Sequence, residues 1–280
     1  MGGIVVGSDG SDVSRYAVEW AAREAELRGE PLRIVHAVQR WLLDAPTEGP
    51  ASEVGKWARE DAGNLLDEAA TQAKQAAPAA EVSTELLSGD ARPALIEAAD
   101  DASMLVVGGR GEGGFAGLLL GSVAHGVLGH TRCPAVVVQN PPGEPAGQIV
   151  AGVDGSQASM AALELAFSEA VNRQATLRAV YIRPPRDSGA AIYGIRPDED
   201  EARKQLSDVV AQVAERHPSV DVLEDVAEGH PVGVLVRASA DADLLIVGQR
   251  GRGGFARLRL GSVSHGVLQH ARCPVMVVPG

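Results

Sequence analysis

Residues 108–122 read GGRGEGGFAGLLLGS, and residues 248–262 read GQRGRGGFARLRLGS. Each stretch follows an aliphatic run and ends in Gly-Ser, directly before a helical pattern. Glycine adopts backbone conformations that other residues resist, and it lets a ligand approach the main chain closely. These two stretches therefore predict a specialised loop that the chain has in two copies.

The similarity between the two halves extends well beyond these loops. Residues 108–138 match residues 248–278 at 22 of 31 positions. Near the start of each half, IVVGSDGS (4–11) corresponds to IVAGVDGS (149–156). An internal repeat on this scale indicates duplicated domains.

The repeat predicts two domains, residues 1–139 and 148–280, joined by a linker at 140–147 that contains proline and glycine. The first domain has five extra residues between its second strand and the following helix. A length change confined to such a connection is typical of a loop.

Each half alternates short aliphatic runs with helical patterns. In the first half, strands are expected at 3–7, 32–38, 81–87, 103–108 and 134–138, and helices at 12–28, 53–77, 91–101 and 121–130. This alternation predicts an α/β fold with a parallel, doubly wound sheet in each half. Such sheets bind ligands beyond the carboxyl ends of the strands, where the winding reverses.

The composition narrows the class of function. Hydrophobic residues make up 45% of the chain, aromatic residues only 3%, and the net charge is −12. An acidic chain is a poor binder of nucleic acid or anionic membranes. No apolar run approaches the 20 residues that a membrane span needs. The two cysteines form no disulfide framework, and we expect a cytoplasmic protein.

Three features are expected at the ligand-binding edge of each half. An aspartate, Asp9 or Asp154, follows the first strand, the glycine loop follows the fourth strand, and a helix begins where the loop ends. Free backbone N–H groups at a helix start attract phosphate. The P-loop motif is absent, and GEGGFA (111–116) follows the wrong strand for a dinucleotide motif.

The spacing of the glycines resembles that of a known family. Both loops fit the pattern G-x2-G-x9-G-[S/T] of ATP-binding universal stress proteins, and GSDGS, GVDGS and the two Cys-Pro pairs fit as well. The resemblance covers essentially the whole chain. It implies two tandem Rossmann-like domains, each with a five-stranded parallel sheet, and ATP, with Mg, at each site.

The resemblance also implies site residues. The two aspartates match the family position near the ribose and the phosphate-bound metal. The positions matching the family's adenine and phosphate contacts are Ala37, Gly108, Gly111, Gly121, Ser122 and Val123 in the first half, and Ile182, Gly248, Gly251, Gly261, Ser262 and Val263 in the second. Before the fourth strand, the family's Ala-Asp pair is present at 242–243 and is Ala-Ser at 102–103.

Structural alternatives exist for several of these residues. The aspartates are also suited to cap the following helices, and Ser122 and Ser262 to serve as N-caps. The glycines could only shape a turn. The histidines at 125, 130, 265 and 270 fit helix surfaces and helix ends, and the cysteines at 133 and 273 fit small buried positions.

Two further expectations follow from loop charge and strand position. The first loop has Arg110 against Glu112, whereas the second has four arginines, at 250, 252, 257 and 259. We therefore expect the second half to bind triphosphate at least as tightly as the first half.

The last strands, 135–138 and 275–278, are apolar sheet edges. We expect them to pair as an internal pseudo-dimer, with a homo-oligomer, a dimer, formed in addition.

The function expected from these observations is an ATP-dependent regulator of the stress response. A slow ATPase or nucleotidyl-transfer enzyme on the same fold is the alternative, with Asp9 and Asp154 acting through a divalent metal. A scaffold that binds no nucleotide is the third. An alanine at Gly111 or Gly251 is expected to weaken binding, either by crowding the phosphates or by disfavouring a positive φ.

Overall fold

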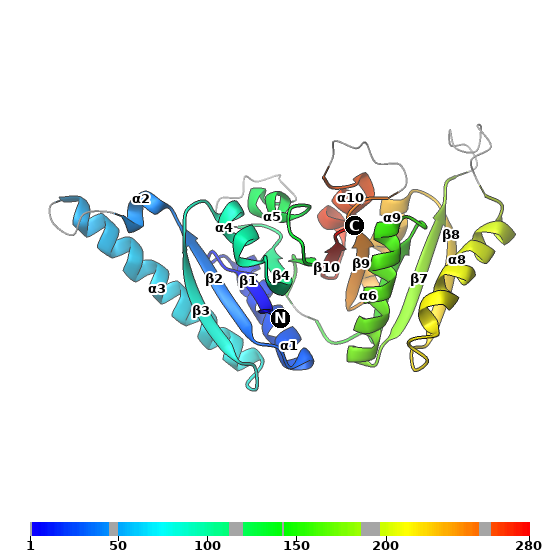
Figure 1. The fold of residues 1–280 in the computed structure, drawn as a ribbon, viewed down its shortest axis with the longest axis horizontal. Helices are drawn as coiled ribbons and strands as arrows, with labels where there is room; N and C mark the ends of the chain where they lie inside the picture. Colours follow the sequence, from blue (N-terminus) through cyan, green and yellow to red (C-terminus); the bar gives the residue numbers. More distant parts are fainter. Residues whose placement is uncertain (1, 45–49, 112–119, 142, 186–196, 252–258) are drawn as a thin grey trace. The chain divides into compact units, whose positions relative to one another are not determined.

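The structure is a computed structural model that describes residues 2–44, 50–111, 120–141, 143–185, 197–251 and 259–280. The chain divides into two compact units, Met1–Pro142 (unit 1) and Gly143–Gly280 (unit 2). Each unit is an α/β domain whose strands pair in parallel (Figure 1).

The elements of unit 1 alternate between strand and helix. In chain order they are β1 (Gly2–Gly7), α1 (Asp12–Arg28), β2 (Leu32–Val38), α2 (Arg40–Leu43), α3 (Pro50–Ala76), β3 (Val82–Ser88), α4 (Ala91–Ala98), β4 (Ala102–Gly108), α5 (Ser122–Val127) and β5 (Ala135–Val138). The strand order is β3-β2-β1-β4-β5, and every described pairing is parallel.

Unit 2 repeats this arrangement. Its elements are β6 (Gln148–Val153), α6 (Gln157–Arg173), β7 (Thr176–Arg183), α8 (Glu199–Ala214), β8 (Val222–Glu228), α9 (Pro231–Ala238), the 3-10 helix η1 (Ser239–Asp241), β9 (Leu244–Gly248), α10 (Ser262–His270) and β10 (Val275–Val278). The strand order is β8-β7-β6-β9-β10, again with parallel pairing.

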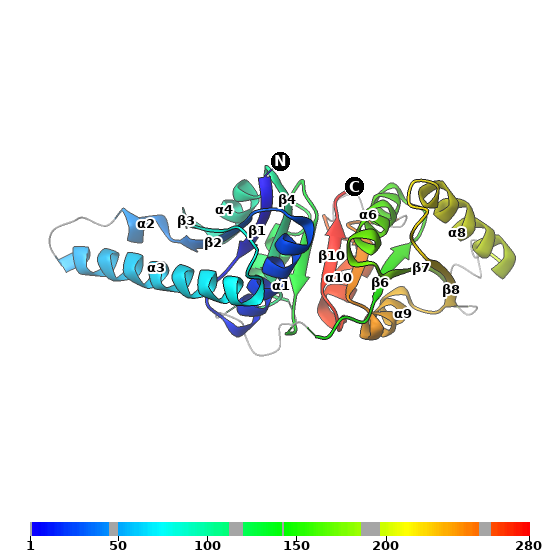
Figure 2. The same ribbon diagram turned by 90° about the horizontal axis from the view of Figure 1, so that it is seen from below.

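In both units the chain reverses its winding beside the first strand. Strand β1 pairs with β2 on one side and with β4 on the other, and β6 pairs with β7 and β9 in the same way. Figure 2 shows α1 and α3 on one side of the first sheet and α4 on the other. The inner strands of each unit, such as β1, β4, β6 and β9, are aliphatic and buried, as expected for a sheet covered on both faces. The edge strands β3 and β8 contain no buried residue.

The two long helices that follow the first strands begin and end where the sequence provides caps. The hydroxyls of Ser11 and Ser156 accept hydrogen bonds from the backbone N–H groups of Ser14 and Ser159. Helix α1 ends at Gly29, whose φ is 65°. A glycine in the left-handed region closes a helix without the steric cost of a Cβ.

The connections contain most of the departures from the sequence-based expectation. The short helix α2 was not expected, and α3 has 27 residues where α8 has 16. Helix α4 ends at Ala98, three residues early. Helix α5 ends at Val127 because Gly129 adopts a φ of 83°. Helix α10 has Gln269 at the corresponding position and continues to His270.

Candidate functional site

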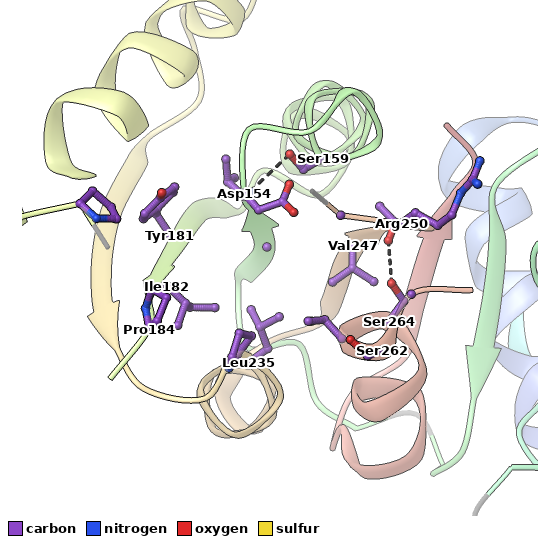
Figure 3. A pocket seen from close by; sticks show the side chains of 18 residues that line it. Asp154, Ser159, Tyr181, Ile182, Pro184, Leu235, Val247, Arg250, Ser262 and Ser264 are labelled. Carbon is purple, nitrogen blue, oxygen red and sulfur yellow. Dashed lines mark hydrogen bonds between the residues drawn. The ribbon is translucent and has the colours of Figure 1, made fainter. Parts of the chain in front are cut away.

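Each unit has a cavity at the point where its sheet reverses its winding. The cavity of unit 1, site 1, has a volume of about 490 Å³, and that of unit 2, site 2, about 420 Å³. Both volumes lie in the range typical of small-molecule sites. The lining comes from the carboxyl ends of the first, second and fourth strands of each unit, and from the helices that face them. Figure 3 shows this arrangement for site 2.

All fourteen residues expected from the sequence line these two cavities. Site 1 is lined by Asp9, Ala37, Gly108, Gly111, Gly121, Ser122 and Val123. Site 2 is lined by Asp154, Ile182, Gly248, Gly251, Gly261, Ser262 and Val263. Residues that lie up to 114 positions apart in the sequence thus meet around one cavity in each unit.

The aspartates are held by the turn that follows the first strand. Asp9 Oδ1 accepts hydrogen bonds from the Ser11 backbone N–H (3.1 Å) and from the Ser11 hydroxyl (2.6 Å). Asp154 Oδ1 accepts one from the Ser156 N–H (2.9 Å). The helices are capped by the serines, so the alternative that the aspartates are the caps is wrong.

The second oxygen of each aspartate faces the glycine loop. A Cβ added to Gly111 would overlap Asp9 Oδ2, and one added to Gly251 would overlap Asp154 Oδ2. These glycines therefore leave room for a carboxylate. The expectation that an added Cβ would crowd phosphates or oppose a positive φ needs correction, because neither glycine has a positive φ.

The other loop glycines have a different role. A Cβ on Gly108 would lie 3.1 Å from the Ser14 backbone nitrogen, and one on Gly248 would lie 2.6 Å from the Ala158 carbonyl carbon. Gly108 and Gly248 therefore let the end of the fourth strand pack directly on the first turn of the helix. This packing brings the glycine loop next to the aspartate.

Both loops are closed at their bases by one backbone hydrogen bond. The Gly121 N–H donates to the Gly109 carbonyl (2.7 Å), and the Gly261 N–H donates to the Gln249 carbonyl (2.9 Å). Gly121 and Gly261 are the N-cap residues of the following helices, and neither provides a side-chain cap. The expectation that Ser122 and Ser262 are N-caps is therefore wrong.

Those two serines are the first helical residues, where backbone N–H groups have no acceptor within the helix. The N–H groups of Ser122 and Val123, like those of Ser262 and Val263, belong to residues that line the cavities. The arrangement suits a ligand with negatively charged oxygens, which such N–H groups bind.

The opposite end of each cavity is mainly apolar. Ala37 and Leu95 line site 1, and Ile182 and Leu235 occupy the matching positions in site 2. Figure 3 shows Ile182 and Leu235 on the same side of site 2, across the cavity from Asp154. A cavity with one polar and one apolar end fits a nucleotide better than a small inorganic anion.

Sequence reasoning missed several cavity residues, among them the apolar pair Leu95 and Leu235 and a polar pair at equivalent positions. His36 lines site 1, and its Nδ1 donates a hydrogen bond to the Ser8 carbonyl (2.7 Å). Tyr181 lines site 2, and its hydroxyl donates to Gln205 Oε1 (3.3 Å). The repeat places these two residues at equivalent positions, next to Ala37 and Ile182, and this alignment could have identified them.

The charged loop residues are only partly described. Arg110 lines site 1 and Arg250 lines site 2, whereas Glu112, Arg252 and Arg257 lie outside the described residues. Figure 3 shows the guanidinium of Arg250 directed away from the cavity. The backbone of the described loop ends, rather than Arg250, therefore forms the polar end of site 2.

The other candidate side chains lie apart from the cavities. The histidines at 125, 130, 265 and 270 are not among the described lining residues. His265 Nε2 lies 3.0 Å from Gln269 Nε2.

The two cysteines are held as neutral thiols by their surroundings. Burial raises the pKa of the Cys133 thiol, and it raises that of Cys273 from 9.0 to about 12. Both cysteines are buried, as small apolar side chains would be.

The described side chains give little support to a metal ion that is bound by the protein without a ligand. Within the described ranges, no group of three or more His, Cys, Asp or Glu side chains could hold one. The described lining residues include one carboxylate in each cavity. This fits Mg²⁺ that arrives with phosphates, since Mg²⁺ is commonly held by one or two carboxylates together with substrate phosphates. Among those same residues, no helix is long and apolar enough to cross a membrane.

The fold and the paired cavities define a tandem, doubly wound α/β protein with one ligand site in each unit. The model of the universal stress protein family matches residues 1–139 and again residues 146–279. The chain therefore belongs to the universal stress protein family.

Full-length relatives support this assignment. The chain is 38% identical to the universal stress protein Rv2623 of Mycobacterium tuberculosis, over 98% of this chain and 95% of that one. It is 35% identical to Rv1996 of the same organism, over 98% and 94%. A crystal structure of a universal stress protein from Archaeoglobus fulgidus has the same fold, with a TM-score of 0.74 at 21% identity, covering 99% of this chain and 96% of that one.

Proposed function

We propose that each unit binds one ATP molecule, with Mg²⁺, and that the protein acts as a nucleotide-dependent regulator in the stress response. The observation that carries the proposal is the contact between Asp9 and Gly111, repeated between Asp154 and Gly251. In both units a carboxylate for ribose or metal adjoins a loop whose glycine backbone suits phosphate.

The two ends of each cavity match the two ends of the nucleotide. The apolar wall at Ala37 and Leu95, or at Ile182 and Leu235, would hold the base. The helix-start N–H groups would bind phosphate oxygens, and the aspartate would bind the ribose or the metal. When bound, Mg²⁺ would neutralise phosphate charge; the residues described above supply the rest of the binding.

The described lining favours binding over catalysis. Among the described residues, the ionisable side chains lining site 2 are Asp154, Tyr181 and Arg250, and the guanidinium of Arg250 points away from the cavity. Those lining site 1 are Asp9, Arg110 and His36, and His36 Nδ1 is hydrogen-bonded to the Ser8 carbonyl. Phosphoryl transfer requires a positioned nucleophile and charge stabilisation beyond a phosphate cradle. We therefore propose that ATP changes the conformation or partner choice of the protein.

The direct test is to denature the purified protein and quantify the small molecules that it releases. Two ATP per chain supports the proposal, and a chain that neither carries ATP nor binds it in calorimetry contradicts it. The variant Asp9→Ala/Asp154→Ala, checked for an unchanged circular dichroism spectrum, should lose most of its ATP affinity. Rapid ATP turnover by the wild type that this variant abolishes would favour the enzyme alternative.

A further inference from the structure

The first turns of α3 expose large apolar side chains to solvent. Trp57 is 66% exposed and Val54, one turn before it, is 47% exposed. Figures 1 and 2 show this end of α3 extending past the carboxyl ends of β2 and β3. Neither residue is among the described residues that line site 1. Exposed apolar surface rimmed by polar residues marks an interaction site, so the neighbours of Trp57 decide what it is for.

The helical period places Trp57 on the side of α3 that faces solvent. Ala62 and Leu66 belong to the opposite side, which is buried in unit 1. Residues three and four positions from Trp57 lie on the same face as its side chain. The outer face of α3, as we name it, consists of five exposed residues: Glu53, Val54, Trp57, Glu60 and Asp61.

This surface belongs to unit 1 and not to the fold in general. Helix α3 has 27 residues, whereas α8, at the same place in unit 2, has 16. When the buried residues Leu66 and Leu206 are aligned, Trp57 corresponds to Pro197, which precedes the first residue of α8. The duplicated domain therefore folds without these turns, and the exposed tryptophan is not needed to build the domain.

The charges around Trp57 indicate which kind of partner fits. Three of the five residues of the outer face are acidic, and the exposed Asp67 and Glu68 extend the acidic stripe along the helix. Of these five carboxylates, Glu60 alone forms an ion pair within the described ranges, with Lys56 at 3.9 Å. Arg59 donates to a backbone carbonyl of α2 (2.9 Å). The remaining carboxylates are therefore available to cations of a partner.

Tryptophan itself adds to this preference for cations. The face of an indole ring attracts a guanidinium or an ammonium group, and tryptophan does so more strongly than the other aromatic residues. Glu60 and Asp61 follow Trp57 by one helical turn, so one basic segment can contact the ring and a carboxylate together. An acidic segment would be repelled from the same surface.

We propose that the outer face of α3 docks a basic segment of another protein, in which arginine or lysine alternates with aliphatic residues. An arginine of the partner stacks on Trp57 and pairs with the carboxylates of the next turn, and an aliphatic side chain covers Val54. Tryptophan is enriched among the residues that contribute most to protein interfaces. This inference goes beyond nucleotide binding and does not depend on it.

Two synthetic peptides of equal length test the proposal against the full chain. One peptide alternates arginine with leucine, and its match has glutamate in place of every arginine. In fluorescence anisotropy titrations, the Arg–Leu peptide should bind and the Glu–Leu peptide should not. Binding should weaken as salt is added, because exposed charges are screened.

Variants of the outer face identify the binding surface. Trp57→Ala should lower the affinity for the Arg–Leu peptide about 10-fold, as expected for a central interface residue. Trp57→Phe should retain most of the affinity, since phenylalanine also attracts cations. Glu60→Gln and Asp61→Asn should each lower it about 3-fold, as expected for one exposed ion pair. All three side chains are exposed, so the melting temperature should stay unchanged.

Unit 2 supplies matched controls for these substitutions. Leu223 on β8 is 51% exposed, so Leu223→Ala removes a similar exposed apolar group far from Trp57 in the sequence. Asp208→Asn removes an exposed carboxylate from α8. Neither control should change the affinity for the Arg–Leu peptide.

Tryptophan emission reports binding at the outer face itself. The chain has three tryptophans, and Trp20 is only 9% exposed. In a Trp41→Phe background, Trp57 is the exposed tryptophan that remains. Saturation with the Arg–Leu peptide should shift its emission to the blue and reduce its quenching by acrylamide.

The remaining outcomes overturn the proposal. If neither peptide binds, or if Trp57→Ala binds the Arg–Leu peptide as the wild type does, the outer face is not a docking site. Equal binding of both peptides would mean that charge plays no part, and a basic partner is then wrong. If sedimentation shows a wild-type dimer that Trp57→Ala converts to a monomer, the occupant is a second copy of this chain instead.

Discussion

The substitution Gly111→Ala tests the contact on which the proposed function depends. The new Cβ would overlap Asp9 Oδ2 and lie 3.3 Å from Asp9 Cγ, so the carboxylate must rotate away. The loop backbone can stay in place, because the obstructing atom is the end of a side chain. We therefore expect the variant to fold and melt nearly as the wild type does, while losing ATP affinity at site 1.

The magnitude follows from what the carboxylate does. Asp9 Oδ1 accepts two hydrogen bonds from Ser11, so rotation also disturbs the position of the other oxygen. A hydrogen bond to a charged group contributes about 1.5–3 kcal/mol. Losing one such contact to ribose or metal lowers the affinity of site 1 by roughly 10- to 100-fold. A titration with Mg·ATP, followed by the hydrogen–deuterium exchange of residues 121–124, measures the affinity of site 1.

A double-mutant cycle isolates the overlap from other effects of the added methyl group. In an Asp9→Ala background the carboxylate is absent, so Gly111→Ala should cost almost no further affinity. Gly63→Ala in α3, where an added Cβ has no neighbour within 4 Å, is the matched control and should leave binding unchanged. Equal costs of Gly111→Ala in both backgrounds would refute the reasoning.

Three further predictions concern stability. Gly248→Ala should destabilise unit 2 by about 1–3 kcal/mol in urea unfolding, because its Cβ would meet the Ala158 backbone, which cannot move aside. Cys273→Ala should flatten the alkaline decline in stability. The folded thiol, with its pKa raised to about 12, keeps a proton that the unfolded chain loses above pH 9. Its contribution is therefore complete below pH 9 and falls by up to about 1.4 kcal/mol per pH unit between pH 9 and 12. Phe167→Ala should cost about 3–5 kcal/mol in the same unfolding assay, since Phe167 is fully buried and stacks on His217.

The fold could be predicted from the sequence because the local helix and strand patterns agree with the internal repeat. Strand β2 and helix α1 have the expected bounds, since an aliphatic run and a serine cap with a terminal glycine mark them independently of tertiary contacts. Helix α2 lacks such signals: its four residues begin without a side-chain cap and contain no buried residue.

The sequence predicted many of the residues that line the candidate site, but it did not predict what each of them contacts there. The repeat and the glycine spacing pointed to the lining residues. They did not reveal that Gly111 faces the Asp9 carboxylate, because that proximity joins residues about a hundred positions apart and depends on the packing of Gly108 on α1. The hydrogen bond from the Gln249 side chain to the Arg259 carbonyl depends likewise on how the chain folds back on itself.

Backbone-based recognition explains how the two sites can differ while the fold is retained. The features shared by both units are the aspartate, the glycine that accommodates it, and the hydrogen bond that closes the base of the loop. None of these requires a particular side chain at the positions where the loop ends differ between the units, Gly109 and Gln249 or Ala124 and Ser264. These positions were therefore free to change after duplication without loss of the cavity.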